Sequence, residues 1–216
     1  GVMSPETYPF VKDKYQIPTK RNIKKSLKLD EIEAIYNYER EEYSSQDMAI
    51  DFWVFSYLCN GANIKDIAFL KYKNIHTETI EFVRAKTERN KKEQEPIIVP
   101  LIDEIKVLIR KWESKKNDQD DFVFPILKKW LTAKQEFDKI KGFVKKINNN
   151  IKSIAEELNI SKKVTTYTAR HSFSTVLKRS GASIEFISES LGHGDTKTTQ
   201  NYLDSFENDV KKEFAA

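Results

Sequence analysis

Apolar residues recur at steps of three and four along most of this chain, and this spacing restricts the folds open to it. The pattern begins with Leu29, Ile32 and Ile35. A more apolar helix is predicted over about residues 47–60 and ends at Gly61, a residue typical of helix C-termini. Further helices are predicted at about residues 64–70, 101–112 and 134–159, followed by three short ones between 168 and 203.

Two short segments have the composition of strands instead. Residues 79–85 are predicted to form one strand and residues 96–99 its return, with a polar hairpin tip between them. Residues 122–124, just before Pro125, predict another short strand. Only six Gly and six Pro among 216 residues argue against a many-turned β architecture. The sequence therefore predicts a mainly α domain with a small antiparallel β-sheet, an α+β fold.

The first 26 residues differ from the rest of the chain. Residues 1–26 hold three of the six prolines and show no helical period, so they predict an extended linker. The linker ends in a basic cluster that includes Lys24 and Lys25, which is either a solvated surface or a contact to a nucleic-acid backbone. Residues 27–216 are predicted to form one domain.

Composition excludes several classes of protein. Hydrophobic residues are 39% of the chain and charged residues 32%, which favours a folded core over disorder. No apolar run approaches the roughly 20 residues that span a bilayer, and no signal peptide opens the chain, so we expect a cytoplasmic protein. One cysteine, and three histidines without a carboxylate cluster, predict no metal site. A net charge of +4 permits nucleic-acid binding without demanding it.

The C-terminal third carries the residues that indicate chemistry. Thr168 is predicted to cap a helix, which would place Arg170 in the first turn, where a guanidinium and free backbone N–H groups form an anion site. His193 lies in a Gly-His-Gly turn whose small neighbours leave its imidazole room to face a ligand. Tyr202 follows nine residues later, on a short polar helix predicted to begin near Asp195.

These residues form an ordered set: Arg170-His171-Ser172-Phe173, then Leu191-Gly192-His193, then Tyr202. The set resembles the catalytic domain of the tyrosine recombinases, the phage-integrase class of DNA recombinases, and the chain is similar to integrases of Bacteroides-type mobile elements. The resemblance extends over roughly residues 20–210. It implies the DNA breaking-rejoining fold, with residues 1–26 leading from an N-terminal core-binding domain and a C-terminal tail after Tyr202.

The resemblance also implies a mechanism without metal, ATP or other cofactor. Tyr202 would attack a DNA phosphate to give a 3′-phosphotyrosyl link and a free 5′-hydroxyl. Lys86, at the end of the first predicted strand, would be the general acid for the leaving oxygen. Arg170 would bind the non-bridging oxygens and His193 would donate a hydrogen bond to the same phosphate.

Two positions depart from the family pattern. Asn63 stands where the family usually has its first arginine, and it brings no charge. Arg84, two residues before Lys86 and on the same side of the strand, is a candidate replacement, and Lys65 is a weaker one. Tyr167 stands where His or Lys is usual; its phenol can hydrogen-bond to the phosphate but is a poor base near neutral pH.

Other residues have less specific interpretations. His171 is expected to pack or hydrogen-bond beneath the site. The basic hairpin residues are either a solvated tip or contacts to DNA phosphates: Arg89, Lys91 and Lys92. The aromatic group in the second predicted helix is expected in the core: Phe52, Trp53, Phe55 and Tyr57.

The sequence thus predicts a site-specific DNA recombinase or integrase that integrates or excises a mobile element. The alternatives are a catalytically weak or idle DNA-binding module of the same fold, a type IB topoisomerase-like enzyme, and a helical scaffold that does not bind DNA. The implied partner is double-stranded DNA, bound by a tetramer of the full-length protein, with this chain alone a monomer. The implied location is the bacterial cytoplasm, associated with the nucleoid, with no membrane contact.

Overall fold

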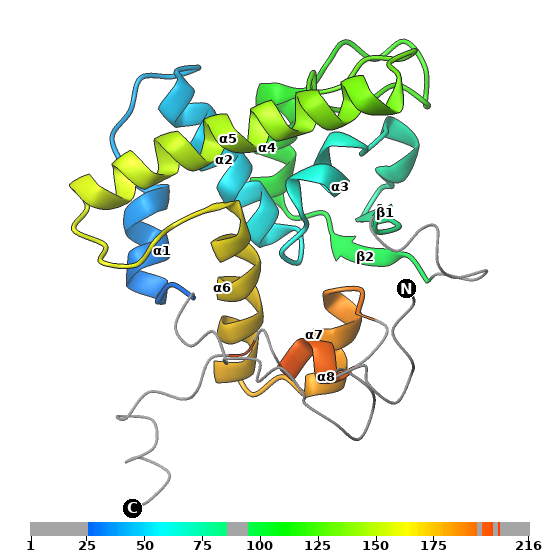
Figure 1. Ribbon diagram of the computed structural model, residues 1–216. Coiled ribbons are helices and arrows are strands. Elements are labelled where there is room, and N and C mark those ends of the chain that lie inside the picture. The colour runs from blue at the N-terminus through cyan, green and yellow to red at the C-terminus, as the bar shows by residue number, and fades with distance from the viewer. Residues whose placement is uncertain (1–25, 86–94, 194–195, 201–202, 204–216) are drawn as a thin grey trace, which may run out of the picture.

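The structure is a computed structural model that describes residues 26–85, 95–193, 196–200 and 203 (Figure 1). Its elements, in chain order, are α1 (Leu29–Tyr36), α2 (Ser45–Leu58), α3 (Ile64–Ala68), the 3-10 helix η1 (Tyr72–Asn74), β1 (Thr79–Phe82), β2 (Ile97–Pro100), α4 (Asp103–Trp112), α5 (Ala133–Glu157), α6 (Thr166–Arg179), α7 (Ile184–Ser190) and α8 (Thr196–Gln200). The predicted α+β class, with many helices and a small antiparallel sheet, is confirmed.

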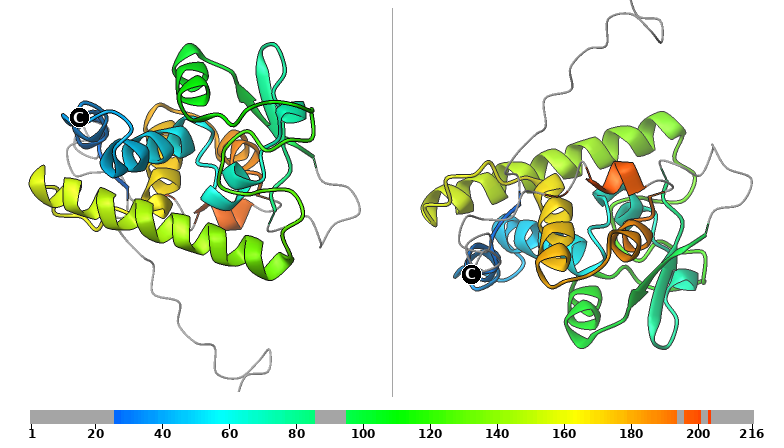
Figure 2. Two further views of the ribbon diagram at one scale, coloured as in Figure 1. Left: turned by 90° about the horizontal axis from the view of Figure 1, so that it is seen from above. Right: turned by 90° about the horizontal axis from the view of Figure 1, so that it is seen from below.

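Helix α2 is the centre of the main core. Every residue from Asp47 to Ser56 is buried, because α5 crosses one side of α2 and α6 packs against another (Figures 1 and 2). A helix surrounded in this way is apolar over most of its circumference. Trp53 is fully buried, and its indole Nε1 donates to the carbonyl of Thr165 at 2.9 Å. Cys59 follows the helix and is also buried, which raises the pKa of its thiol.

The aromatic residues of α2 lie where the sequence predicts them. Phe52 and Phe55 both pack edge-on against Phe124, with ring centroids 5.0 and 5.1 Å apart. Tyr57 is partly buried and stacks on Trp53. No helix in the described part of the chain is long and apolar enough to span a membrane.

The two strands pair as an antiparallel hairpin, with Ile80 opposite Val99 and Phe82 opposite Ile97. These four side chains are buried, whereas Ile98 on the outer face is exposed, as the two-residue period of a strand requires. Strand β1 ends at Phe82, three residues before the predicted end.

The strand predicted at residues 122–124 is wrong. This described segment makes one isolated bridge, between Lys71 and Phe122, and no ladder. Val123 and Phe124 are neighbours in sequence and both are buried, so their side chains do not alternate between two faces. The apolar run therefore reflects a loop that crosses the core.

A second, smaller apolar cluster lies below the main core. Its buried members are Ile187, Leu191 and Leu203, with Phe173 and Leu177 of α6 packed against them. Helix α7 also contacts β2, so the hairpin and the C-terminal helices meet on one side of α6 (Figure 1).

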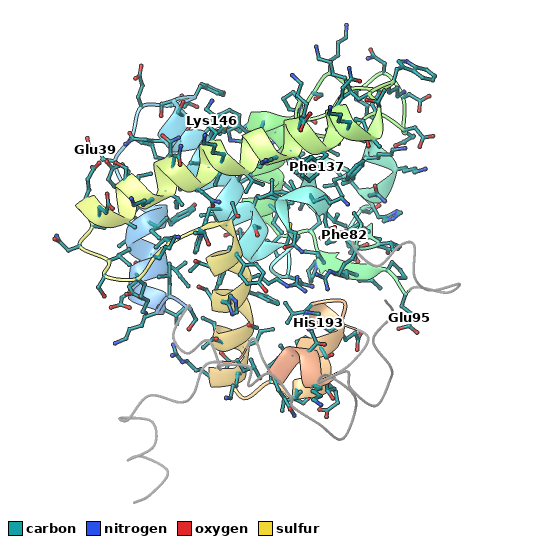
Figure 3. All side chains as sticks on the ribbon, viewed as in Figure 1. Glu39, Phe82, Glu95, Phe137, Lys146 and His193 are labelled. Carbon is teal, nitrogen blue, oxygen red and sulfur yellow. The ribbon has the colours of Figure 1, made fainter. Side chains whose placement is uncertain are left out.

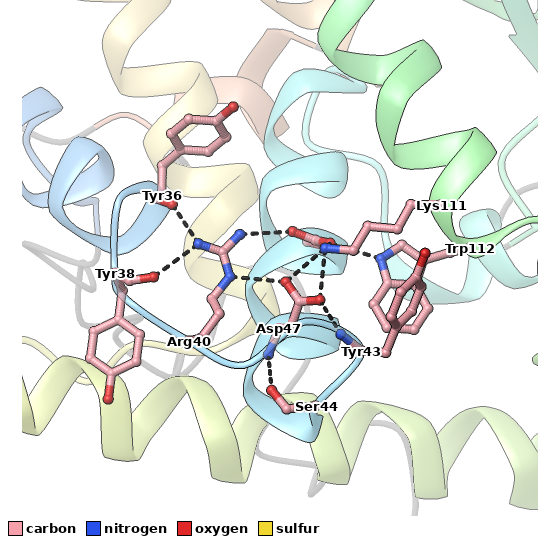
Figure 4. A network of polar contacts seen from close by, with 9 residues as sticks. Tyr36, Tyr38, Arg40, Tyr43, Ser44, Asp47, Lys111 and Trp112 are labelled. Atoms are coloured by element: carbon pink, nitrogen blue, oxygen red, sulfur yellow. Dashed lines mark hydrogen bonds and ion pairs between the residues drawn. The ribbon is translucent and has the colours of Figure 1, made fainter.

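A network of four charged side chains joins the loop after α1 to α2 and α4 (Figure 4). Arg40 contacts Asp47 and Asp51 at 3.0 and 3.1 Å, and Lys111 contacts the same two carboxylates at 2.7 Å each. Trp112 Nε1 donates to Asp51 at 2.8 Å. The two aspartates are almost completely buried, so these contacts replace the water that burial removes.

Candidate active site

The start of α6 differs from the sequence-based prediction. The N-cap is Thr165, not Thr168, and Arg170 is the fifth residue of the helix instead of lying in its first turn. Thr168 Oγ1 accepts from the Thr165 N–H at 3.0 Å, and Asn148 Oδ1 accepts from the Thr166 N–H at 2.8 Å. Because side chains of the protein satisfy these N–H groups, the predicted anion site at this helix end is not formed as expected.

Arg170 instead points across to two other segments. Its side chain is 1% exposed; Nη1 donates to the carbonyl of Gly61 at 2.9 Å and Nη2 to that of Leu191 at 2.6 Å. Nη2 also lies 3.0 Å from Nε2 of His193. Arg170 therefore joins the loop after α2 to the turn after α7 and holds His193 beside its guanidinium.

Two glycines make this close packing possible. A Cβ on Gly61 would lie 2.8 Å from Cα of Arg170, and one on Gly192 would lie 2.6 Å from Cδ1 of Ile97 and 2.9 Å from Cδ of Arg84. Both residues have positive φ, 65° and 61°, which side chains other than glycine rarely adopt. A side chain at Gly61 would overlap Arg170, and one at Gly192 would overlap Ile97 and Arg84.

Arg84 brings a second guanidinium to the same turn. It lies two residues beyond the end of β1 and is 8% exposed, and its Nη1 is 3.4 Å from the carbonyl oxygen of Gly192. Arg170 and Arg84 thus donate to the carbonyls of consecutive residues, Leu191 and Gly192. Lys65, the weaker candidate cation, is exposed.

Asn63 is the N-cap of α3, and its side chain is directed towards Asp66. Its Nδ2 lies 3.4 Å from Oδ2 of Asp66, whose Oδ1 accepts from the Ala85 N–H at 2.9 Å. Asp66 is 6% exposed and holds the backbone next to Arg84. Sequence reasoning missed Asp66; the available signal was an acidic residue three positions after the helix cap.

Tyr167 lies on α6 at the edge of the site, with its side chain 42% exposed. Its ring meets that of His171 edge-on, with centroids 4.7 Å apart. His171 is 5% exposed, in agreement with the packing role predicted for it.

Several candidate residues lie outside the residues that the structure describes. They are Tyr202, Lys86, Arg89, Lys91, Lys92, Lys24 and Lys25. The described part of the site brings together Arg170, His193 and Arg84, with Asn63 and Tyr167 at its margins. Within the described residues no group of three or more His, Cys, Asp or Glu could hold a metal ion.

Such a set of cations around a histidine, on a mainly helical domain with a small hairpin, suits an enzyme that acts on a phosphate ester. Residues 25–209 match the phage integrase family, and the chain belongs to that family.

Curated relatives and solved structures agree with this assignment. The chain is 29% identical over 188 residues to tyrosine recombinase XerD of Halalkalibacterium halodurans; the match covers 85% of this chain and 58% of the relative. Its fold is similar to the crystal structure of the XerA recombinase, with a TM-score of 0.59, 21% identity, and coverage of 91% of this chain and 64% of XerA. XerH in a post-cleavage complex with its palindromic difH substrate gives a TM-score of 0.60 at 18% identity, covering 94% of this chain and 55% of XerH.

Proposed function

We propose that this chain is the catalytic part of a site-specific DNA recombinase that cuts and rejoins DNA through a covalent tyrosine intermediate. The observation that carries the proposal is the contact of Arg170 with His193 and with the Leu191 carbonyl. Arg84 donates to the carbonyl of Gly192 in the same turn. Guanidinium groups and a histidine converging on one point are suited to a phosphodiester, whose non-bridging oxygens accept hydrogen bonds. XerH, which has a similar fold, is a site-specific recombinase bound to DNA in its solved complex.

The proposed reaction needs neither metal nor ATP. The hydroxyl of Tyr202 gives its proton to solvent water, its oxygen bonds to the phosphorus, and the bond from phosphorus to the 5′-oxygen breaks. Lys86 gives a proton to that leaving oxygen. The phosphotyrosyl bond conserves the free energy of the phosphodiester, so a 5′-hydroxyl can attack it and rejoin the strand. Arg170 and His193 stabilise the extra negative charge of the transition state.

Arg84 supplies the positive charge that Asn63 lacks in this proposal. Its guanidinium is held beside Gly192, one residue from His193, whereas the Asn63 amide is directed to Asp66. The proposed contacts with DNA outside the cleaved phosphate are Lys24, Lys25, Arg89, Lys91 and Lys92. Tyr167 is proposed to hydrogen-bond to the phosphate from the exposed edge of the site.

The whole protein is proposed to act as a tetramer on two double-stranded DNA sites, and to integrate or excise a mobile element like those of the Bacteroides group. This chain spans about half the length of the curated relatives it matches, so those properties concern more than the residues present here. Association with the bacterial nucleoid follows from the proposed substrate.

Covalent trapping on a nicked suicide substrate tests the proposal. The substrate carries the candidate crossover site of the parent element, and the readout is an SDS-resistant protein–DNA band. We expect the band with the wild type, none with Tyr202→Phe, and a rate about 10²–10³ lower with Arg84→Ala, the usual loss for an oxyanion-stabilising donor. Lys86→Ala should slow cleavage too, and a 5′-phosphorothiolate leaving group, which needs no general acid, should restore its rate.

Arg110→Ala is the matched control, because Arg110 is an exposed arginine on α4 with the same charge. It should cleave at the wild-type rate. A band that persists with Tyr202→Phe would overturn the assignment of the nucleophile.

One observation favours a second function, an idle DNA-binding module. Asn63 brings no charge to the position at which the family usually has an arginine, and its amide is directed to Asp66. Such a module would bind the crossover DNA with the usual salt dependence but give no covalent band, even as the full-length protein.

A further inference from the structure

Both ring nitrogens of His193 have a partner from a different helix. Nε2 lies 3.0 Å from Nη2 of Arg170 on α6, and Nδ1 lies 2.9 Å from Oγ1 of Thr199 on α8. The ring lies between the hairpin and the C-terminal helices (Figure 3). Thr199 is completely buried, so its hydroxyl has no water as an alternative partner.

These two contacts define where the imidazole carries its proton. A guanidinium is a donor only, so Nη2 of Arg170 must donate and Nε2 of His193 must accept. A neutral imidazole that accepts at one nitrogen carries its hydrogen on the other, so Nδ1–H donates to Oγ1 of Thr199. A hydrogen on Nε2 would place two donors face to face at 3.0 Å.

We infer that Thr199 is a positioning residue: it accepts from the Nδ1–H that the contact with Arg170 requires, and so holds the imidazole with its Nε2 edge turned towards Arg170. The rest of the histidine is fixed as well: its backbone N–H donates to the carbonyl of Ser188 at 2.9 Å. The hydroxyl of Thr199 therefore fixes the rotation of the ring about its side-chain bonds, which the backbone contact leaves open.

The consequence for catalysis rests on the proposed DNA cleavage. When a phosphate arrives, its non-bridging oxygens accept from Arg170 and Nη2 leaves Nε2. One proton from solvent added at Nε2 then gives an imidazolium whose Nε2–H donates to a non-bridging oxygen. Nδ1–H stays on Thr199 throughout, so the ring does not have to turn over. Without that acceptor, the ring loses the contact that fixes its orientation, and the contact to the phosphate is made less often.

Nitrogen-15 NMR of the histidine rings tests the inference without DNA. The chain holds three histidines, and a His193→Gln variant identifies the signals that belong to His193. In the wild type we expect a protonated Nδ1 and an unprotonated, acceptor-type Nε2. Thr199→Val keeps the branched shape but leaves the Nδ1–H without its acceptor, so the Nδ1 signal should move away from its wild-type position. Thr199→Ser, which keeps the hydroxyl, should give the wild-type pattern.

Cleavage rates on the suicide substrate provide the second readout. Thr199→Val should lower the rate about tenfold, the usual worth of one hydrogen bond, and Thr199→Ser should restore most of it. Thr198→Val, an exposed neighbour on α8, is the matched control and should change neither readout.

Each outcome distinguishes the two proposals. A wild-type His193 protonated on Nε2, or a Thr199→Val variant whose His193 signals are unchanged, overturns the positioning role. The expected tautomers with no cleavage by any variant would leave the positioning role intact and count against the proposed function.

Discussion

At the scale of single residues, the site depends on glycine as much as on charge. Gly61 contributes its carbonyl to Arg170, and the absence of a side chain lets the arginine backbone approach. Its φ of 65° adds a second reason, because a β-carbon is strained in that conformation. The position of the most buried arginine of the site is therefore set by a residue that has no side chain.

Replacing Gly61 by alanine should lower the free energy of unfolding by about 1–3 kcal/mol, because the new methyl group overlaps the backbone of Arg170. Urea unfolding followed by circular dichroism measures the change. Gly142→Ala is the control: Gly142 lies within α5, and its added Cβ would have no atom within 4 Å. That variant should gain about 0.5–1 kcal/mol, the helix preference of alanine over glycine. Equal shifts in the two variants would contradict the packing argument.

At the scale of elements, the network of Arg40, Asp47, Asp51 and Lys111 fixes α2 to α4 and to the loop after α1. Burial alone would raise the pKa of Asp47, but hydrogen bonds from Lys111, the Tyr43 N–H and Arg40 outweigh it and lower that pKa. Burial likewise acts to lower the pKa of Lys111, and its two carboxylate partners raise it above its usual value. Both shifts mean that the charged forms are stabilised in the folded state.

The sign of the Asp47 shift predicts acid lability. A carboxyl whose pKa is lowered by folding stabilises the folded state at pH values above its unfolded-state pKa, about 3.9. This stabilisation is lost as the pH falls through the lower pKa of the folded state. Asp47→Asn should therefore be less stable than the wild type at pH 7, by about 2–3 kcal/mol, with a gap that narrows towards pH 2. Urea unfolding of both proteins between pH 7 and pH 2 measures this difference in the free energy of unfolding.

Asp103→Asn is the control for that experiment. Asp103 is an exposed residue of α4 paired with Lys106, and its loss should leave the free energy of unfolding nearly unchanged at pH 7. A gap between Asp47→Asn and the wild type that stays constant with pH would show that the carboxylate charge is not the stabilising feature.

At the scale of the whole molecule, the two apolar clusters differ greatly in size. Within the described residues, the main core extends from α1 to α6, whereas the smaller cluster has three buried members: Ile187 of α7, Leu191 and Leu203. His193 and Thr199 lie beside the smaller cluster, and Arg170 lies on α6, the helix that contacts both clusters. Local opening should therefore begin at the side that presents the histidine.

Hydrogen exchange measures this difference directly. Amides of residues 184–193 and 196–200 should exchange faster than those of residues 45–58, because fewer buried contacts must be broken to expose them. Mass spectrometry measures the exchange of both segments in the same sample, so each segment is the reference for the other. Equal protection of the two segments would mean that the chain opens as one cooperative unit.

The sequence was sufficient for most of the elements. The predicted starts of α1 and α3 agree with the structure, and α5 begins one residue before its predicted start, because helical spacing is a local property. The predicted N-cap of α6 was wrong, since Thr168 and Thr165 are both good capping residues. The hydrogen bonds of Trp53 to the Thr165 carbonyl and of the Thr166 N–H to Asn148 come from residues distant in sequence. The apolar segment at residues 122–124 gave no sign that it crosses the core as a loop.

The contacts within the site were less accessible to sequence reasoning. The resemblance to the recombinases placed Arg170, His193 and Arg84 among the candidates, and the structure brings these three to one turn. Gly61 and Arg170 are separated by 109 residues, so nothing in the local pattern indicates that one accepts a hydrogen bond from the other. Thr199 was missed for a related reason: an interior threonine on a polar helix has no distinctive signal until its partner is known.

The burial of Cys59 makes the chain convenient for site-specific labelling. Its thiol is 2% exposed and is the only one in the sequence, so maleimide dyes and spin labels will not react with the folded wild type. A single cysteine introduced elsewhere, for example Trp130→Cys at a side chain that is 97% exposed, will therefore be modified alone. Fluorescence or electron paramagnetic resonance can then follow this molecule without removal of its natural cysteine.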